Sequence, residues 1–168
     1  MLEFKIQKLA YKKGIAAKAL HLESSMMIGE FIEGEHKKRL SKKELRQLAN
    51  VIKKLHSIKI RQKPILFSKA KKFKKELVLC HGDLNVKNIL FGKKVKLIDW
   101  EYAGIYDKYF DFASISKEFK LNTVDEAYFL RAYGDKLDSK KLQVYKNIYE
   151  ILYKEWFEKL KNGKLSFL

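Results

Sequence analysis

The 168-residue sequence is long enough for one domain or one large lobe of a larger fold, and 46% of its residues are hydrophobic, which is sufficient for a buried core. Its single cysteine, Cys80, excludes a disulfide framework within one chain, and no stretch is long and apolar enough to span a bilayer. The net charge of +17 is compatible with nucleic-acid or anionic-membrane contact, but the lysines are spread along the whole chain, which favours solvated surfaces.

The N-terminal segment has no continuous apolar centre and no small-residue cleavage site, so it is not a secretory signal, and we expect a cytoplasmic protein. The densest basic run is SKAKKFKKE, from Ser68 to Glu76. It contains one aromatic residue, Phe73, and therefore offers no platform on which bases could stack. We expect no specific nucleic-acid partner and no membrane span, although the run would help to attract a polyanionic ligand.

The first half of the chain contains helix and strand signals in alternation. Apolar residues recur at helical spacing over residues 2–13, and Gly14 follows as a stop signal. Residues 17–25 and 26–34 are predicted to be two strands joined by a polar turn, with Gly34 closing the second. Residues 40–58 predict a helix that begins with a capping box of Ser41 and Glu44. Residues 59–75 predict a basic connection with a short helix.

The second half begins with short strands and ends with helices. Residues 76–80 predict a buried strand, and residues 88–91 and 94–99 a hairpin with its turn at Gly92 and Lys93. After Asp111 the chain becomes helical. One helix is capped by Thr123 and Glu126 and ends near Gly134, and a last helix covers residues 140–161 before Gly163. The apolar stripe predicted for this last helix consists of Leu142, Tyr145, Tyr149, Leu152, Trp156 and Leu160. This order of elements predicts an α+β fold dominated by helices.

The stretch from Leu79 to Gly104, LCHGDLNVKNILFGKKVKLIDWEYAG, places Asp83, Asn88 and Asp99 around two short apolar strands. Phosphoryl transfer uses this order of groups: a carboxylate that accepts the proton of the attacking hydroxyl, an amide oxygen for a metal ion, and a second carboxylate on the same ion. Magnesium prefers such hard oxygen ligands. The spacing therefore indicates phosphoryl-transfer chemistry.

Each of these residues also has a simpler interpretation. Asp83 and Asn85 could be loop residues that bond their own backbone, and Asp107 is interpreted as a solvated loop acid. His81 is interpreted as a structural histidine that braces the loop holding Asp83. The compound pattern is more specific than any single element: histidine-x-aspartate, five residues to asparagine, then an apolar strand ending in aspartate.

The segments HGDLNVKNIL and LIDWEYAG resemble the catalytic and metal-binding segments of the choline/ethanolamine kinase and aminoglycoside phosphotransferase superfamily. YFDFASI resembles the segment of that family whose aspartate, here Asp111, braces the catalytic loop. The resemblance extends upstream through the predicted strand pair and LANVIKKLHSI, and it covers about residues 3–156.

The resemblance implies a protein-kinase-like fold, with residues 1–34 as a remnant of the N-terminal lobe sheet and residues 35–168 as the mostly helical, catalytic C-terminal lobe. It implies ATP and Mg²⁺ as cofactors, Asp83 as catalytic base, and Asn88 and Asp99 as magnesium ligands. It also implies an adenine-binding hinge at Glu30, Phe31 and Ile32.

Trp100 and Glu101 follow Asp99 here, which is similar to the choline, ethanolamine and thiamine kinase branch. These substrates carry a hydroxyl beside a cationic nitrogen, which aromatic faces and a carboxylate can hold. The predicted substrate-binding residues are Glu101, Tyr102 and Trp156, whereas Tyr149 and Tyr153 are interpreted first as core residues.

The glycine-rich loop and the strand lysine of a full kinase of this family are not found in the sequence, and Glu3 resembles the residue that would pair with that lysine. Three explanations are open: a fragment or misplaced start, a truncated and inactive gene, or a lysine elsewhere that substitutes. The function predicted is an ATP-dependent phosphotransferase for a small amino-alcohol. The alternatives are a non-catalytic kinase-like binding module and, third, a basic nucleic-acid binder.

Overall fold

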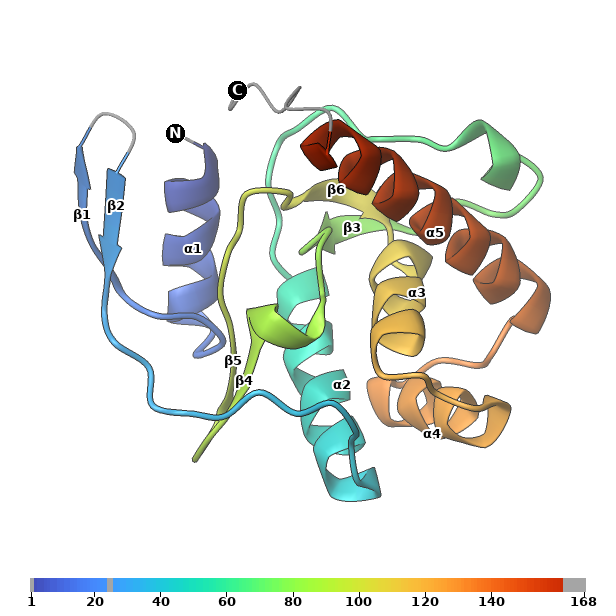
Figure 1. Cartoon of the computed structure of the whole chain (residues 1–168), viewed down its shortest axis with the longest axis horizontal. Helices are drawn as coiled ribbons and strands as arrows, with labels where there is room; N and C mark the ends of the chain where they lie inside the picture. Colours follow the sequence, from blue (N-terminus) through green and yellow to red (C-terminus); the bar gives the residue numbers. More distant parts are fainter. Residues whose placement is uncertain (1, 24–25, 162–168) are drawn as a thin grey trace.

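The computed structural model of the chain describes residues 2–23 and 26–161. In chain order the elements are α1 (Leu2–Lys12), β1 (Ala19–Glu23), β2 (Met26–Gly29), α2 (Lys42–His56), η1 (Ser68–Ala70), β3 (Leu77–Cys80), η2 (Val86–Asn88), β4 (Ile89–Phe91), β5 (Val95–Leu97), β6 (Gly104–Asp107), α3 (Tyr109–Glu118), α4 (Thr123–Tyr133) and α5 (Ser139–Lys161). The fold is α+β and mostly helical in its second half, as the sequence predicts (Figure 1).

Local signals account for the starts and ends of the first helices. The helix predicted over residues 2–13 is confirmed as α1, and Gly14 follows it with φ +73°, a left-handed conformation that glycine adopts without a steric penalty. The predicted capping box of α2 is also confirmed: the Ser41 side chain accepts from the Glu44 backbone, and the Glu44 carboxylate accepts from the Ser41 backbone N–H at 2.7 Å.

Two element boundaries differ from the prediction, at the start of α4 and at the end of β2. The N-cap of α4 is Asn122, whose side chain accepts from the Asp125 N–H at 2.9 Å, so Thr123 lies inside the helix. Strand β2 ends at Gly29, five residues before the predicted Gly34. The polar turn predicted between the two strands lies outside the described residues in part, as does Gly163.

The described residues form three two-stranded antiparallel sheets, β1–β2, β3–β6 and β4–β5. The predicted hairpin is confirmed as β4–β5, with Phe91 opposite Val95 and therefore a three-residue connection, one residue longer than predicted. Strand β6 was not predicted, and it pairs with β3 so that Cys80 lies opposite Gly104. This pairing brings the end of β3 next to the loop that follows β5.

One hydrophobic core joins the helices to the small sheets. Figure 1 shows α1 and the β1–β2 hairpin on one side of the β4–β5 hairpin, and α3, α4 and α5 on the other. The Leu97 N–H donates to the Ile15 carbonyl at 2.8 Å, which ties the segment after α1 to β5. The predicted division between residues 1–34 and 35–168 stays a prediction.

Among its described side chains, the stripe predicted for α5 is buried only in the first half of the helix, and the side chain of Leu160 lies outside the description. Leu142, Tyr145 and Tyr149 are buried, whereas Leu152 and Trp156 are 38% and 40% exposed. The described side chains of α5 from Glu150 onward are all exposed, so the second half of the helix adds little to the core. Within the described ranges, every helix is either too short or too polar to serve as a transmembrane span.

Candidate active site

The loop between β3 and β4 carries Asp83, and side-chain amides of the same loop bind the Asp83 carboxylate. The amide of Asn85 donates to Asp83 Oδ2 at 2.9 Å, and the Asn88 amide donates to the same oxygen at 2.8 Å. Asp83 is half-buried, and desolvation raises the pKa of its carboxyl above the ordinary value, although both amides oppose this shift. Its other oxygen, Oδ1, accepts no hydrogen bond from the described residues.

Asn88 closes this loop from the last position of η2. Its amide nitrogen also donates to the Asp83 carbonyl at 2.9 Å, so the five-residue step places the two side chains in direct contact. Both hydrogen bonds use Nδ2, which leaves Oδ1 without a partner among the described residues. The Asn85 side chain caps η2 by accepting from the Lys87 and Asn88 backbone N–H groups at 2.8 and 3.2 Å.

Asp99 reaches the same region from the end of β5. The Ile98 N–H donates to the Asn88 carbonyl at 3.1 Å, which places Asp99 directly beyond Asn88 across the hairpin. Asp99 is exposed and has φ +63°, a left-handed conformation that aspartate tolerates better than most residues. Its negative charge is one of the smaller causes of the raised pKa of Asp83, after burial.

His81 connects the two loops that carry these carboxylates. Its Nε2 lies 3.0 Å from the Ile98 carbonyl, and because that oxygen only accepts, the proton is on Nε2. His81 is fully buried, and burial lowers its pKa, so the ring is neutral at ordinary pH. The ring therefore works as a fixed spacer between the Asp83 loop and the residue before Asp99.

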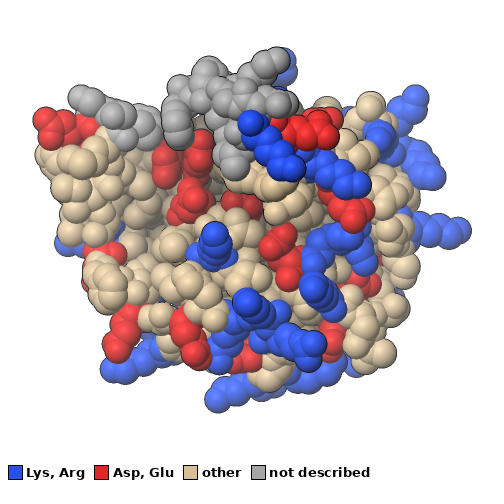
Figure 2. Space-filling view, viewed as in Figure 1, with Lys and Arg blue, Asp and Glu red and all other residues tan. Residues whose placement is uncertain are grey.

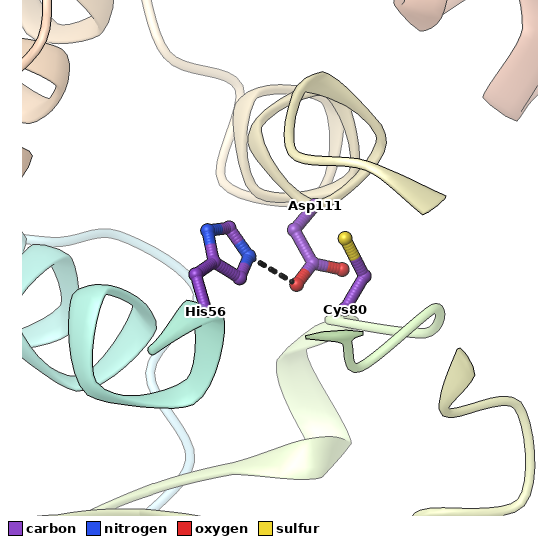
Figure 3. A group of neighbouring side chains, drawn as sticks. All are labelled: His56, Cys80 and Asp111. Carbon is purple, nitrogen blue, oxygen red and sulfur yellow. Dashed lines mark hydrogen bonds and ion pairs between the residues drawn. The ribbon is translucent and has the colours of Figure 1, made fainter. Parts of the chain in front are cut away.

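Asp111, in the first turn of α3, lies beneath the Asp83 loop. Its fully buried carboxylate accepts from the His81 N–H at 3.0 Å and from the Gly82 N–H at 3.1 Å. His56, from the end of α2, adds a third contact with Nε2 at 3.0 Å, and its Nδ1 lies 3.0 Å from the Tyr133 hydroxyl. Figure 3 shows His56 and Cys80 on either side of this carboxylate.

His56, Cys80 and Asp111 lie close enough together to be compared with a metal site, since one atom of each lies within 4.8 Å of the others. Their hydrogen bonds indicate a different role. Both His56 nitrogens and both Asp111 oxygens already have partners. Burial raises the pKa of the Cys80 thiol well above its ordinary value, so it stays protonated. We interpret the group as a buried hydrogen-bonded anchor for the loop.

Gly82 allows the Asp83 loop to approach the segment after Asp99. It has φ +84°, and a Cβ atom there would lie 2.3 Å from the Tyr102 carbonyl oxygen. No side chain fits at that distance, so glycine is required both by conformation and by contact. Gly14 has a similar φ of +73° but no atom within 4 Å of its position for Cβ.

Four carboxylates gather at this site. Burial raises the pKa of Glu3 in α1, and the charges of Asp99 and Glu101 raise it further. In the described part of the chain, Glu3, Asp83, Asp99 and Glu101 form no ion pair with lysine or arginine. Figure 2 shows acidic atoms in the hollow between α1 and the C-terminal half of α5. This excess negative charge fits a site that binds cations.

The predicted substrate-binding residues lie beside the carboxylates. Tyr102 and Trp156 are 42% and 40% exposed. Burial and the charge of Glu101 raise the pKa of Tyr102, and hydrogen bonding with the neighbouring Trp156 side chain opposes the shift, so the two aromatic side chains are adjacent. Tyr153, which was expected to be a core residue, is instead 53% exposed and lies 6.4 Å from Trp156 between ring centroids. Tyr149 is buried, as expected, and its hydroxyl donates to Glu118 at 3.0 Å.

The predicted hinge follows β2 as an extended segment. The Glu30 N–H donates to the Lys18 carbonyl at 2.8 Å, which continues the β1–β2 pairing by one residue. Phe31 is 90% exposed and Ile32 is half-buried. In the part of the chain that the structure describes, no backbone hydrogen bond uses the peptide groups of Phe31 or Ile32.

Sequence reasoning missed two contributors to this site. His56 is separated from Asp111 by 55 residues, and no local pattern pairs a histidine at a helix end with a distant carboxylate. Glu118 was missed as the partner of Tyr149. Its position seven residues after Asp111, two helical turns along the same face, is a signal that could have found it.

Comparison with known proteins decides the family. Residues 62–159, more than half of the chain, match the choline/ethanolamine kinase family. The chain belongs to this family. A LicA homologue from Metamycoplasma hominis is 36% identical over 77 residues, which are 45% of this chain and 31% of that protein. The chain thus spans about a third of the length of this curated relative.

Solved structures of this kinase superfamily share the fold. The choline kinase LicA from Streptococcus pneumoniae has a TM-score of 0.83 at 18% identity, with 99% of this chain and 74% of that chain covered. Spectinomycin phosphotransferase in complex with ADP and spectinomycin has a TM-score of 0.67 at 17% identity, with coverage of 86% and 67%. The fold is therefore the protein-kinase-like fold of choline kinases and aminoglycoside phosphotransferases.

The contrast between Gly82 and Gly14 gives a direct test of the loop packing. We expect Gly14→Ala to lower the free energy of unfolding by about 1 kcal/mol, the cost of a left-handed alanine alone. Gly82→Ala adds a backbone clash and should cost at least roughly 2 kcal/mol more. Urea unfolding of both variants measures the difference. Equal costs would show that the Asp83 loop does not depend on its contact with Tyr102.

Proposed function

We propose that this chain carries the hinge and catalytic lobe of an ATP-dependent phosphotransferase that acts on the hydroxyl of a small amino-alcohol such as choline, ethanolamine or thiamine. The observation that carries the proposal is the convergence of Asp83, Asn88 and Asp99 at one edge of the β4–β5 hairpin. Membership of the choline/ethanolamine kinase family supports it.

Asp83 acts as the general base. Both amide contacts fall on Oδ2, so Oδ1 is free to accept the proton of the substrate hydroxyl. The two amides fix the carboxylate in one orientation, and positioning is the main contribution a protein makes to phosphoryl transfer. Burial raises the pKa of Asp83, which makes it a better proton acceptor than an exposed aspartate.

Asn88 and Asp99 would hold magnesium. The available oxygens are Asn88 Oδ1, which has no hydrogen bond within the described residues, and the exposed carboxylate of Asp99. This set of hard oxygens and the uncompensated charge around it fit Mg²⁺. Magnesium bound there would neutralise charge on the phosphates of ATP. His81 and Asp111 would keep the two ligand-bearing loops at a fixed separation.

The adenine of ATP would lie against the segment Glu30, Phe31 and Ile32. The unused peptide groups of Phe31 and Ile32 offer a donor and an acceptor to the edge of the base. A cationic substrate nitrogen would lie against Tyr102 and Trp156, with the Glu101 carboxylate near it. Aromatic faces and one carboxylate together hold a quaternary or primary ammonium group.

Two aspartate variants separate catalysis from metal binding. Asp83→Asn keeps the shape of the loop but removes the base, so we expect phosphate transfer to choline or ethanolamine to fall at least about a hundredfold while nucleotide binding is retained. Asp99→Asn should abolish the gain in ATP affinity that Mg²⁺ gives. Calorimetric titration of ATP with and without Mg²⁺ and a phosphate-transfer assay measure these effects.

Asp125→Asn is the matched control, because Asp125 forms a surface ion pair with Lys42 away from the site. In the active protein, transfer should rise with pH as Asp83 loses its proton, with an apparent pKa above that of an exposed aspartate. Equal transfer by all three variants would refute the assigned roles. Nucleotide binding without any Mg²⁺ dependence would favour a non-catalytic kinase-like module.

A substitution of Trp156 tests whether the substrate carries a cationic nitrogen that this side chain holds. Trp156→Ala should raise the KM for choline roughly tenfold and leave the affinity for ATP unchanged, because the lost contact is with the cationic group. Phe157→Ala is the control, since Phe157 is the next residue of α5, is similarly exposed and contacts Lys161. If both variants keep the KM of the parent chain, the cation is held elsewhere.

A further inference from the structure

A basic surface on the other side of β3 has no part in the chemistry proposed above. The segment 65–77, most of which belongs to the predicted basic connection of residues 59–75, forms η1 and enters β3. We call its outer side the η1 surface and define it by its exposed members, Ile65, Leu66, Lys69, Lys71, Lys72 and Lys75. Figure 2 shows lysine and arginine atoms over this region, beside α5.

The η1 surface exposes aliphatic side chains as well as charge. Ile65 and Leu66 are 41% and 53% exposed, and Leu77, at the start of β3, is 38% exposed. They line a mainly apolar hollow of about 270 Å³, whose floor includes Phe67 and Tyr145. Lys71 and Lys75 are at the same hollow, so apolar and cationic groups are adjacent.

The lysines of this surface are not used inside the molecule. Among the described residues, none of Lys69, Lys71, Lys72 and Lys75 forms an ion pair with a carboxylate. The nearby acids are already bound by other lysines. Glu76 pairs with Lys108 at 2.6 Å and with Lys141 at 3.0 Å. Asp107, which also lines the hollow, is buried and not solvated as expected, and it pairs with Lys141 at 2.9 Å. Lys69 also lines a second depression on α5 with Ile151, Lys154 and the acid Glu150, which already pairs with Lys117 at 2.6 Å.

We propose that the η1 surface docks this protein on an anionic phospholipid bilayer. Clustered lysines attract an anionic headgroup layer, and each contributes separately to binding. Exposed Ile65 and Leu66 would enter the boundary between headgroups and acyl chains, and the hollow beside them offers room for part of one chain. Attraction and apolar insertion together give reversible attachment without a membrane span.

The composition of the surface favours lipid over nucleic acid. Proteins that hold single strands combine lysines with aromatic faces on which bases stack. Here the aromatic residue of the basic run, Phe73, is half-buried, and Lys72 lies over its ring at 5.3 Å. The exposed apolar groups are aliphatic, and these suit an acyl boundary rather than a base.

Vesicle co-sedimentation tests the proposal with the protein as it exists. Vesicles of phosphatidylcholine mixed with phosphatidylglycerol should bind the chain, and vesicles of phosphatidylcholine alone should not. The triple variant Lys71→Gln, Lys72→Gln, Lys75→Gln should bind the mixed vesicles roughly a hundredfold more weakly. The double variant Ile65→Ser, Leu66→Ser should lose about tenfold and keep the salt dependence of the parent chain.

A charge-matched control removes three exposed lysines from other faces: Lys12→Gln, Lys13→Gln, Lys43→Gln. It should bind mixed vesicles within about threefold of the parent chain if the surface, rather than net charge, is responsible. Equal losses in both triple variants, or no binding to mixed vesicles, would overturn the proposal. Tighter, lysine-dependent binding to a DNA oligonucleotide than to vesicles would overturn it as well. Circular dichroism and thermal unfolding check that each variant is folded.

Discussion

The geometry of the site depends on one buried carboxylate. Asp111 accepts hydrogen bonds from the His81 and Gly82 backbone N–H groups and from the His56 ring, and it is fully shielded from water. A buried charge with unsatisfied oxygens is costly, and so is a buried donor without an acceptor. The loop, α2 and α3 therefore stabilise one another only in this arrangement, which leaves Asp83 at a fixed place directly after Gly82.

A few further contacts position Asp99 and Asn88 relative to the loop that Asp111 holds. The His81 ring contacts the Ile98 carbonyl and so fixes the backbone directly before Asp99. The Asn88 amide donates to the Asp83 carboxylate and so holds the end of η2 against it. The resulting cluster of carboxylates lies within a chain whose net charge is +17. Among the described residues, none of the site's carboxylates pairs with a lysine or arginine, so the site is locally negative although the chain as a whole is strongly basic.

What could be predicted from the sequence is what short-range rules determine. The period of α1 and the capping box of α2 are encoded within a few residues, and both were predicted correctly. The proximity of Asp83, Asn88 and Asp99 follows from a five-residue step and a hairpin, although their roles stay predictions. Strand β6 could not be found, because its four residues gain their strand character from partners 24 to 30 residues earlier in the chain. His56 was missed for the same reason.

The central claim is that Asn88 and Asp99 share a divalent ion beside the Asp83 carboxylate. A crystal structure of the chain grown with ADP and Mn²⁺ tests it most directly, because manganese scatters anomalously and accepts the oxygen ligands of magnesium. The account predicts an anomalous peak at coordination distance, about 2.1 Å, from both Asn88 Oδ1 and the Asp99 carboxylate. An ion held by His56, Cys80 and Asp111, or one that contacts neither Asn88 nor Asp99, would contradict it.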